Sequence, residues 1–121
     1  MNLGFIGTGN IVSDVIIGIS KSKIRYKKII ISPRNKKKAL YLKKNLKNIV
    51  IAKDNQEVVN KADWVFLGIL PKVGEAILSK LQFRNKQIIV SFMSTTNYLK
   101  LKRLIKSKSI IIRAIPMPPI R

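Results

Sequence analysis

Two glycines separated by one residue stand where the chain passes from an apolar run into a helical pattern. The motif is Gly7-Thr8-Gly9-Asn10, and Ile11 opens the apolar periodicity that follows it. Gly7 permits a tight turn, and Gly9 lets an anion approach the unpaired backbone amides and positive dipole at a helix start. The pattern predicts a site for the diphosphate of a dinucleotide, with a purely structural turn as the alternative.

A second polar cluster follows the next apolar run. At this place a dinucleotide enzyme usually has either an acid for the NAD ribose or an arginine for the NADP phosphate. Here no acid is present, and Ser32 and Arg34 are followed by lysines at 36–38. Because arginine suits bidentate contact with phosphate, the cluster favours NADP over NAD as the cofactor. A solvated turn in a lysine-rich chain is the alternative, and it explains the lysines better than Arg34.

Short runs of β-branched residues alternate with helical stretches, which is typical of a parallel sheet with helices on its faces. The expected strands are 2–7, 28–32, 49–51, 64–69, 87–92 and 109–113, and the expected helices are 10–20, 36–46, 56–61, 73–81 and 97–106. Several strands are apolar throughout, as strands covered on both faces should be. Right-handed crossovers would give the doubly wound order 3-2-1-4-5-6 of a single Rossmann α/β domain.

The first expected helix combines one favourable and one unfavourable feature. Ile11, Val15, Ile16 and Ile19 have helical spacing and are expected to face the sheet. Val12 occupies the third position of the glycine pattern, where a small residue normally allows close packing of helix on strand. Its bulk weakens the match to a dinucleotide-binding motif.

The composition excludes several kinds of chemistry. The chain has no cysteine and no histidine, so we expect no disulfide, no metal site and no imidazole catalysis. The five acidic residues all have ordinary helix or turn explanations, and no catalytic residue is identified; they are Asp14, Asp54, Glu57, Asp63 and Glu75. No apolar run approaches the roughly 18 residues needed to span a bilayer, so we expect a cytoplasmic protein without a membrane partner.

The net charge of +20 has two interpretations. One is a nucleic-acid or anionic-membrane partner. The other is the lysine, isoleucine and asparagine bias of an AT-rich coding sequence, which the scatter of lysines over several elements favours. Only 7% of residues are aromatic, so stacking platforms for single strands are few. We expect no specific nucleic-acid partner, and only weak, salt-sensitive binding to polyanions.

The last eight residues differ from the rest of the chain. Their prolines remove backbone donors and fix φ, so 114–121 can be neither a helix nor a central strand. We expect an NADP-binding domain over 1–113, followed by an extended connector that leads towards a part of the protein not included in the chain.

Several segments together resemble one known family. They are 4–10 (GFIGTGN), Gly18, 32–33 (SP), 54–55 (DN) and 62–71 (ADWVFLGILP). In this order they resemble pyrroline-5-carboxylate reductase and the wider group of deazaflavin-dependent NADP reductases. The resemblance implies that the glycine loop holds the diphosphate and that Ser32 faces the 2′-phosphate. It also implies that Asn55 contacts the adenosine ribose, and that the loop of Ile69, Leu70 and Pro71 passes along the cofactor.

The sequence departs from the family on the nicotinamide and substrate side. The family usually has lysine where Leu70 stands, Ala-Ala-Gly where Met93-Ser94-Thr95 stands, and asparagine where Met117 stands. The adenosine side of the cofactor site therefore agrees with the family better than the side that would meet the substrate.

The resemblance also carries an expected activity. It implies hydride transfer from NADPH to the C=N bond of a small imine-like substrate, as in proline biosynthesis, with the cofactor doing the chemistry. It further implies a C-terminal helical domain that dimerises and completes the active site, so a homo-oligomer is expected only with that domain and the chain alone is expected to be inactive. The alternatives are an NADP reductase with another substrate and a non-catalytic dinucleotide-binding or sensing module.

Overall fold

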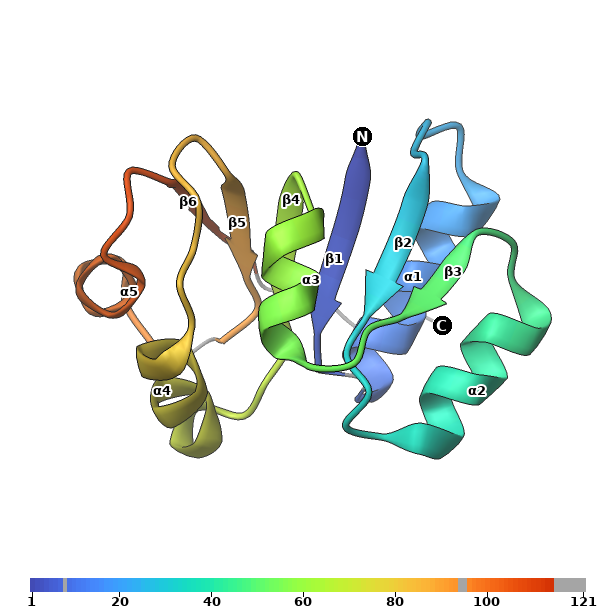
Figure 1. Cartoon of the computed structure of the whole chain (residues 1–121), viewed down its shortest axis with the longest axis horizontal. Helices are drawn as coiled ribbons and strands as arrows, with labels where there is room; N and C mark the ends of the chain where they lie inside the picture. Colours follow the sequence, from blue (N-terminus) through green and yellow to red (C-terminus); the bar gives the residue numbers. More distant parts are fainter. Residues whose placement is uncertain (8, 94–95, 115–121) are drawn as a thin grey trace, which may run out of the picture.

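A computed structural model describes residues 1–7, 9–93 and 96–114, in which parallel strands alternate with helices (Figure 1). The strands are β1 (Asn2–Ile6), β2 (Lys28–Ile31), β3 (Ile49–Ile51), β4 (Trp64–Leu67), β5 (Ile88–Ser91) and β6 (Ile110–Arg113). The helices are α1 (Asn10–Lys21), α2 (Lys36–Asn45), α3 (Asn55–Lys61), α4 (Pro71–Lys80) and α5 (Tyr98–Ile105). The strand order is β3-β2-β1-β4-β5-β6, which confirms the predicted doubly wound Rossmann fold.

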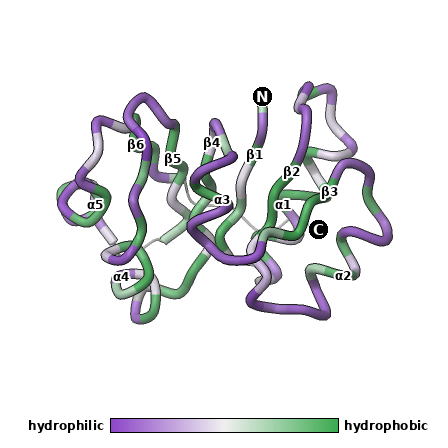
Figure 2. Tube along the Cα trace, in the orientation of Figure 1, coloured by the Kyte–Doolittle hydropathy of each residue, from purple (hydrophilic) through white to green (hydrophobic). Residues whose placement is uncertain are grey.

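Two apolar cores lie on opposite faces of the sheet. On one face α1 and α2 pack through Val12, Ile16 and Leu42 against the inner strands. On the other face α3, α4 and α5 pack on the sheet through residues such as Val58 and Leu78. Figure 1 shows α3 in front of the sheet and α1 behind it, and Figure 2 shows that hydrophobic residues concentrate in the strands while many loops are hydrophilic. The sheet is therefore fixed in place from both sides near β1.

The edge strand β6 is less covered than the sequence suggests. On the face that carries α1, Ile110 is 56% exposed and Ile112 is 42% exposed. Within the described residues, β6 is therefore not one of the strands that are covered on both faces. The reason is topological, because α1 and α2 connect strands on the other side of β1 and pack over that half of the sheet.

Two helices differ from the prediction, α4 in where it begins and α1 in which residue faces the sheet. Helix α4 begins at Pro71 rather than at position 73, because proline needs no hydrogen-bond acceptor in a first turn and its fixed φ suits a helix. In α1 Val12 is fully shielded from solvent, as is the predicted Ile16, while Ile11 is 52% exposed and does not face the sheet. None of the described helices has the length and hydropathy needed to cross a bilayer.

Candidate cofactor-binding site

Strands β1, β2 and β4 end at the same edge of the sheet (Figure 1). A cleft lies at this carboxyl edge. It consists of two adjoining cavities of about 510 and 580 Å³. Both cavities are lined by Gly9, Gly68, Ile69 and Leu70, so they lie side by side and we describe them together as one cleft. Its position is the switch point of the strand order, where open α/β sheets bind their ligands.

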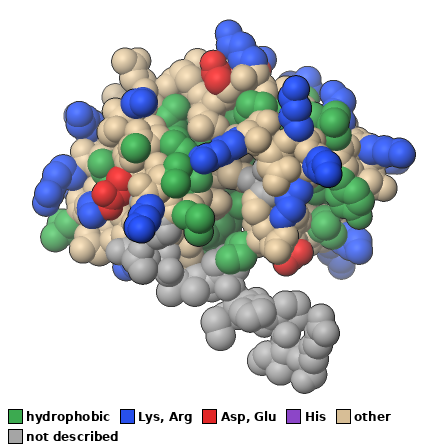
Figure 3. Space-filling model, turned by 90° about the horizontal axis from the view of Figure 1, so that it is seen from below, with side chains coloured by type: hydrophobic (Ala, Val, Ile, Leu, Met, Phe, Trp, Pro, Cys, Tyr) green, Lys and Arg blue, Asp and Glu red, His purple; other side chains and the backbone are tan. Residues whose placement is uncertain are grey.

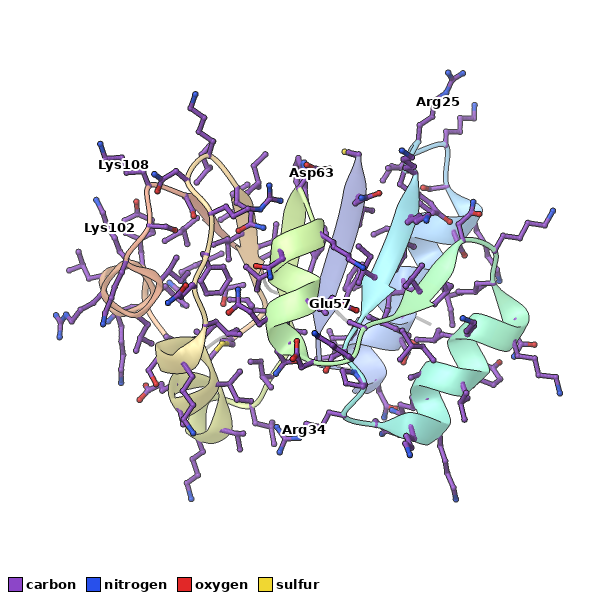
Figure 4. All side chains as sticks on the ribbon, in the orientation of Figure 1. Arg25, Arg34, Glu57, Asp63, Lys102 and Lys108 are labelled. Atoms are coloured by element: carbon purple, nitrogen blue, oxygen red, sulfur yellow. The ribbon has the colours of Figure 1, made fainter. Side chains whose placement is uncertain are left out.

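One half of the cleft is cationic. Arg34, Lys36 and Lys37 line it together with Asn35, and no acidic residue stands in the first turn of α2. Figure 4 shows Arg34 projecting below the carboxyl ends of β1 and β2. Lysines near a helix N-terminus are repelled by its positive dipole end, so this arrangement is stabilised when an anion is bound there. We refer to this part of the cleft as the cationic half.

The other half of the cleft is apolar. Its described lining comprises Ile11, Val12, Phe92 and Met93 in addition to the four shared residues and Asn10, and none of these side chains is charged. Leu70, 75% exposed, stands at the rim of both cavities. Figure 3, which views the molecule from this edge, shows hydrophobic side chains between flanking lysines and arginines. This apolar half suits a flat, uncharged ring.

The turn after β1 is held by backbone geometry that only glycine tolerates. Gly7 has φ of +98°, and a Cβ placed on it would collide with the backbone carbonyl of Gly68 at the end of β4. The two strands are joined at this point by a hydrogen bond of 2.9 Å from the Gly68 amide to the Ile6 carbonyl. In contrast, a Cβ on Gly9 would meet no atom within 4 Å, so the helix start is open to an approaching ligand.

Gly68 also explains why Val12 is tolerated at a position that is usually small. A Cβ on Gly68 would collide with Cγ2 of Val12, which is fully buried. The space that a small residue on α1 would normally leave is left instead by Gly68, the residue directly after β4. The close packing of helix on strand is therefore preserved, and the unfavourable sequence feature is compensated within the same contact.

We expect Gly68→Ala to lower the free energy of unfolding by about 1–3 kcal/mol, because the added methyl overpacks the contact with Val12. Adding Val12→Ala to this variant removes the collision. The free energy of unfolding of the double variant should therefore be about 0.5–3 kcal/mol higher than the value expected if the two single losses simply added. Urea unfolding of the four proteins measures this coupling. Strictly additive losses would show that the two residues do not compensate each other.

Two predicted site residues are joined in the structure. Ser32 is buried, and its hydroxyl donates to Oδ1 of Asn55 at 2.9 Å and accepts a longer bond of 3.5 Å from the Arg34 amide. Asn55 is the first residue of α3, and the preceding Asp54 caps that helix by accepting from the Glu57 amide at 2.8 Å. Ser32 thus links the turn that carries Arg34 to the start of α3, and Asn55 is not itself the capping residue.

The remaining predicted residues fall in three places. Gly7, Gly9, Asn10, Ile11, Ile69 and Leu70 line the cleft. Pro71 is the first residue of α4 and not part of the preceding loop. Thr8, Ser94, Thr95 and all of the predicted connector after Ala114, including Met117, lie outside the described residues. Four further lining residues were not predicted to meet the cofactor, although Gly68 and Phe92 directly follow strand ends; they are Asn35, Gly68, Val73 and Phe92.

The acidic residues with a described role stabilise the fold. Asp63 lies at the opposite edge of the sheet from the cleft (Figure 4), where its carboxylate accepts from the Asn2 amide at 2.7 Å. Glu57 accepts from the Lys53 amide at 3.1 Å near the start of α3. These contacts agree with the structural explanation expected for Asp63, and neither residue lines the cleft.

The glycine turn, the cleft at the switch point and its two chemically different halves define a Rossmann-type domain of the dinucleotide-binding class. The chain belongs to the family described as NADP oxidoreductase, coenzyme F420-dependent, whose model matches residues 2–95. This result confirms the resemblance inferred from the sequence motifs.

Individual relatives point to the same group. The pyrroline-5-carboxylate reductase of Haemophilus influenzae is 28% identical over 120 residues, which are 97% of this chain and 43% of the relative. The crystal structure of 1-pyrroline-5-carboxylate reductase from Streptococcus pyogenes has a TM-score of 0.78 at 28% identity, covering 96% of this chain and 42% of that one. Pyrroline carboxylate reductase of Plasmodium falciparum, solved with NADP bound, has a TM-score of 0.76 at 21% identity, with 96% and 42% coverage. The chain thus spans less than half the length of these relatives, and the last of them shows the fold alone.

Proposed function

We propose that this chain is the NADP(H)-binding domain of a reductase related to pyrroline-5-carboxylate reductase. The observation that carries the proposal is the pair of adjoining cavities at the glycine turn, with a cationic half beside Arg34 and an apolar half beside Met93. Membership of an NADP oxidoreductase family supports the same cofactor. In the proposed arrangement residues 1–113 form the binding domain and 114–121 are a connector.

The distribution of charge in the cleft indicates how the cofactor is oriented when it is bound. The 2′-phosphate of NADP lies in the cationic half, where Arg34 forms a charge-assisted contact and Ser32 holds the backbone of that turn. The diphosphate crosses the start of α1 above Gly9, where no side chain stands in the way. The nicotinamide ring then occupies the apolar half.

The proposed reaction is hydride transfer from NADPH to the C=N bond of a small imine-like substrate in the cytoplasm. Bound NADPH supplies the hydride, and the chain supplies binding and orientation. The H. influenzae and S. pyogenes relatives are both pyrroline-5-carboxylate reductases. Pyrroline-5-carboxylate is therefore the first substrate to test, and proline biosynthesis is the first pathway. A related NADP reductase with another substrate is the alternative, favoured by Leu70 and Met93 at positions where the family usually has lysine and alanine.

We expect Arg34→Ala to weaken NADPH binding by about 1.5–3 kcal/mol and to leave NADH binding nearly unchanged, because only NADPH carries the phosphate that this guanidinium would contact. Titration calorimetry of both cofactors at physiological salt measures the difference. Arg25→Ala is the matched control, because it removes the same charge from the opposite edge of the sheet (Figure 4). Equal losses for the two cofactors in Arg34→Ala would contradict the assignment.

A further inference from the structure

A side-chain hydrogen bond connects α1 and α2, two of the helices that begin at the cleft. Lys38, in the first turn of α2, donates from Nζ to Oδ1 of Asn10, the first residue of α1. These residues come from the two segments to which the sequence assigns different parts of the cofactor, the glycine turn and the cluster after β2. The bond therefore holds a third cationic side chain of α2 against the start of α1.

The start of α1 has no negative charge of its own. Its capping residue, Gly9, has no side chain to accept from the free amides, and no acidic residue stands in the first turn of either α1 or α2. Each helix N-terminus carries a partial positive charge of about half an elementary charge, so the Lys38 ammonium lies near two ends that repel it. An anion bound at the start of α1 would attract both the Lys38 ammonium and the positive end of the helix, and would so offset their mutual repulsion.

Lys38 differs from the neighbouring lysines in where it is held. Lys36 and Lys37 are exposed and line the cationic half on the side of Arg34. Lys38 is partly buried and lines neither cavity, whereas its partner Asn10 lines the apolar half beside Gly9. Because an ammonium has three donors, the bond to Asn10 leaves two for a ligand at the start of α1. The ammonium of Lys38 is thus anchored at the start of α1, where the diphosphate is proposed to bind, and not among the side chains that line the cationic half.

We propose that Lys38, held by Asn10, is the cation that binds the diphosphate of the dinucleotide, and so contributes equally to NADP and NAD binding. The inference rests on the proposed function and adds a division of labour to it. Arg34 distinguishes the two cofactors, whereas Lys38 contacts the part that they share. The contact made by Lys38 is charge-assisted and is therefore sensitive to salt.

The test compares the affinities of both cofactors in Lys38→Met, measured by titration calorimetry. We expect the dissociation constants of NADPH and NADH to rise by the same factor, roughly tenfold or more, as for the loss of one charge-assisted hydrogen bond. The salt dependence of NADH binding should also become shallower than in the unmodified chain. Lys44→Met, in the last turn of the same helix, removes an equal charge and is expected to change neither affinity.

The other outcomes are distinguishable. A loss confined to NADPH would place Lys38 at the 2′-phosphate, and unchanged affinities for both cofactors would make its bond to Asn10 a purely structural link; either result overturns the inference. If the unmodified chain binds neither cofactor, the proposed function itself fails. Should Lys38→Met unfold below the assay temperature, Lys38→Gln keeps a donor for Asn10 without the charge, and the same parallel losses are expected.

Discussion

Gly7→Ala should lower the free energy of unfolding by about 2–6 kcal/mol, a large part of the 5–15 kcal/mol typical of a whole domain. Two costs combine. A φ of +98° is a conformation that alanine rarely adopts, and holding it there costs about 1–3 kcal/mol. The new methyl also collides with the carbonyl of Gly68, and forced overpacking costs a further 1–3 kcal/mol. Urea unfolding followed by circular dichroism measures the loss.

Gly9→Ala is the matched control for this prediction, because it makes the same chemical change two residues later. Its φ is −72°, and the added methyl meets no atom within 4 Å. We expect a loss of stability below about 1 kcal/mol, the range for changes of a capping residue. The affinity for NADPH and NADH should nevertheless fall, because the methyl occupies space that the diphosphate needs. Equal stability losses in the two variants would contradict the role given to the Gly7 turn.

The second prediction concerns turnover, where the expected effect is several orders of magnitude. The 121-residue chain should bind NADPH without oxidising it when pyrroline-5-carboxylate is added. The cleft is open at its rim, where Leu70 is 75% and Ile11 is 52% exposed, and the described lining of the apolar half offers no charged side chain to the substrate carboxylate. Hydride transfer needs donor and acceptor within about 3–3.5 Å, and correct positioning is worth roughly 10⁵-fold or more in rate.

NADPH absorbance, followed at high concentrations of the chain and of the substrate, tests this expectation. The full-length H. influenzae relative, of which this chain covers 43%, is the positive control under the same conditions. Robust substrate-dependent oxidation by the 121-residue chain would show that the described cleft is sufficient for catalysis, and would overturn the view that it provides only the cofactor half of an active site.

The fold was predictable from the sequence because local and global signals agree in this chain. The short β-branched runs gave the strands to within one or two residues, and the topology follows from the handedness of the crossovers. Errors arose where a signal was ambiguous. Both Ile11 and Val12 are apolar and adjacent at the helix start, so spacing alone could not decide which of them faces the sheet.

The site was predictable at the level of strand ends, but not of contacts. The sequence located the glycine turn and Arg34 at the cleft because both follow strands that end at one edge. It could not show that Gly68 makes room for Val12, since the two residues meet only through the packing of α1 against β4. The bond from Ser32 to Asn55 likewise depends on the distance between β2 and α3 in the folded chain.

The parallel pairing of β1 with β4 has a consequence for how the chain folds. These strands are distant in sequence, since the hydrogen bond between Asn2 and Asp63 joins residues 61 positions apart. Closing so long a loop of chain is entropically costly and slow. The glycine turn and the Gly68 carbonyl meet only when this pairing is complete. A folding intermediate that contains only the first half of the sheet therefore has no cleft. A dinucleotide that binds there would slow unfolding of the native state without accelerating the early steps of folding.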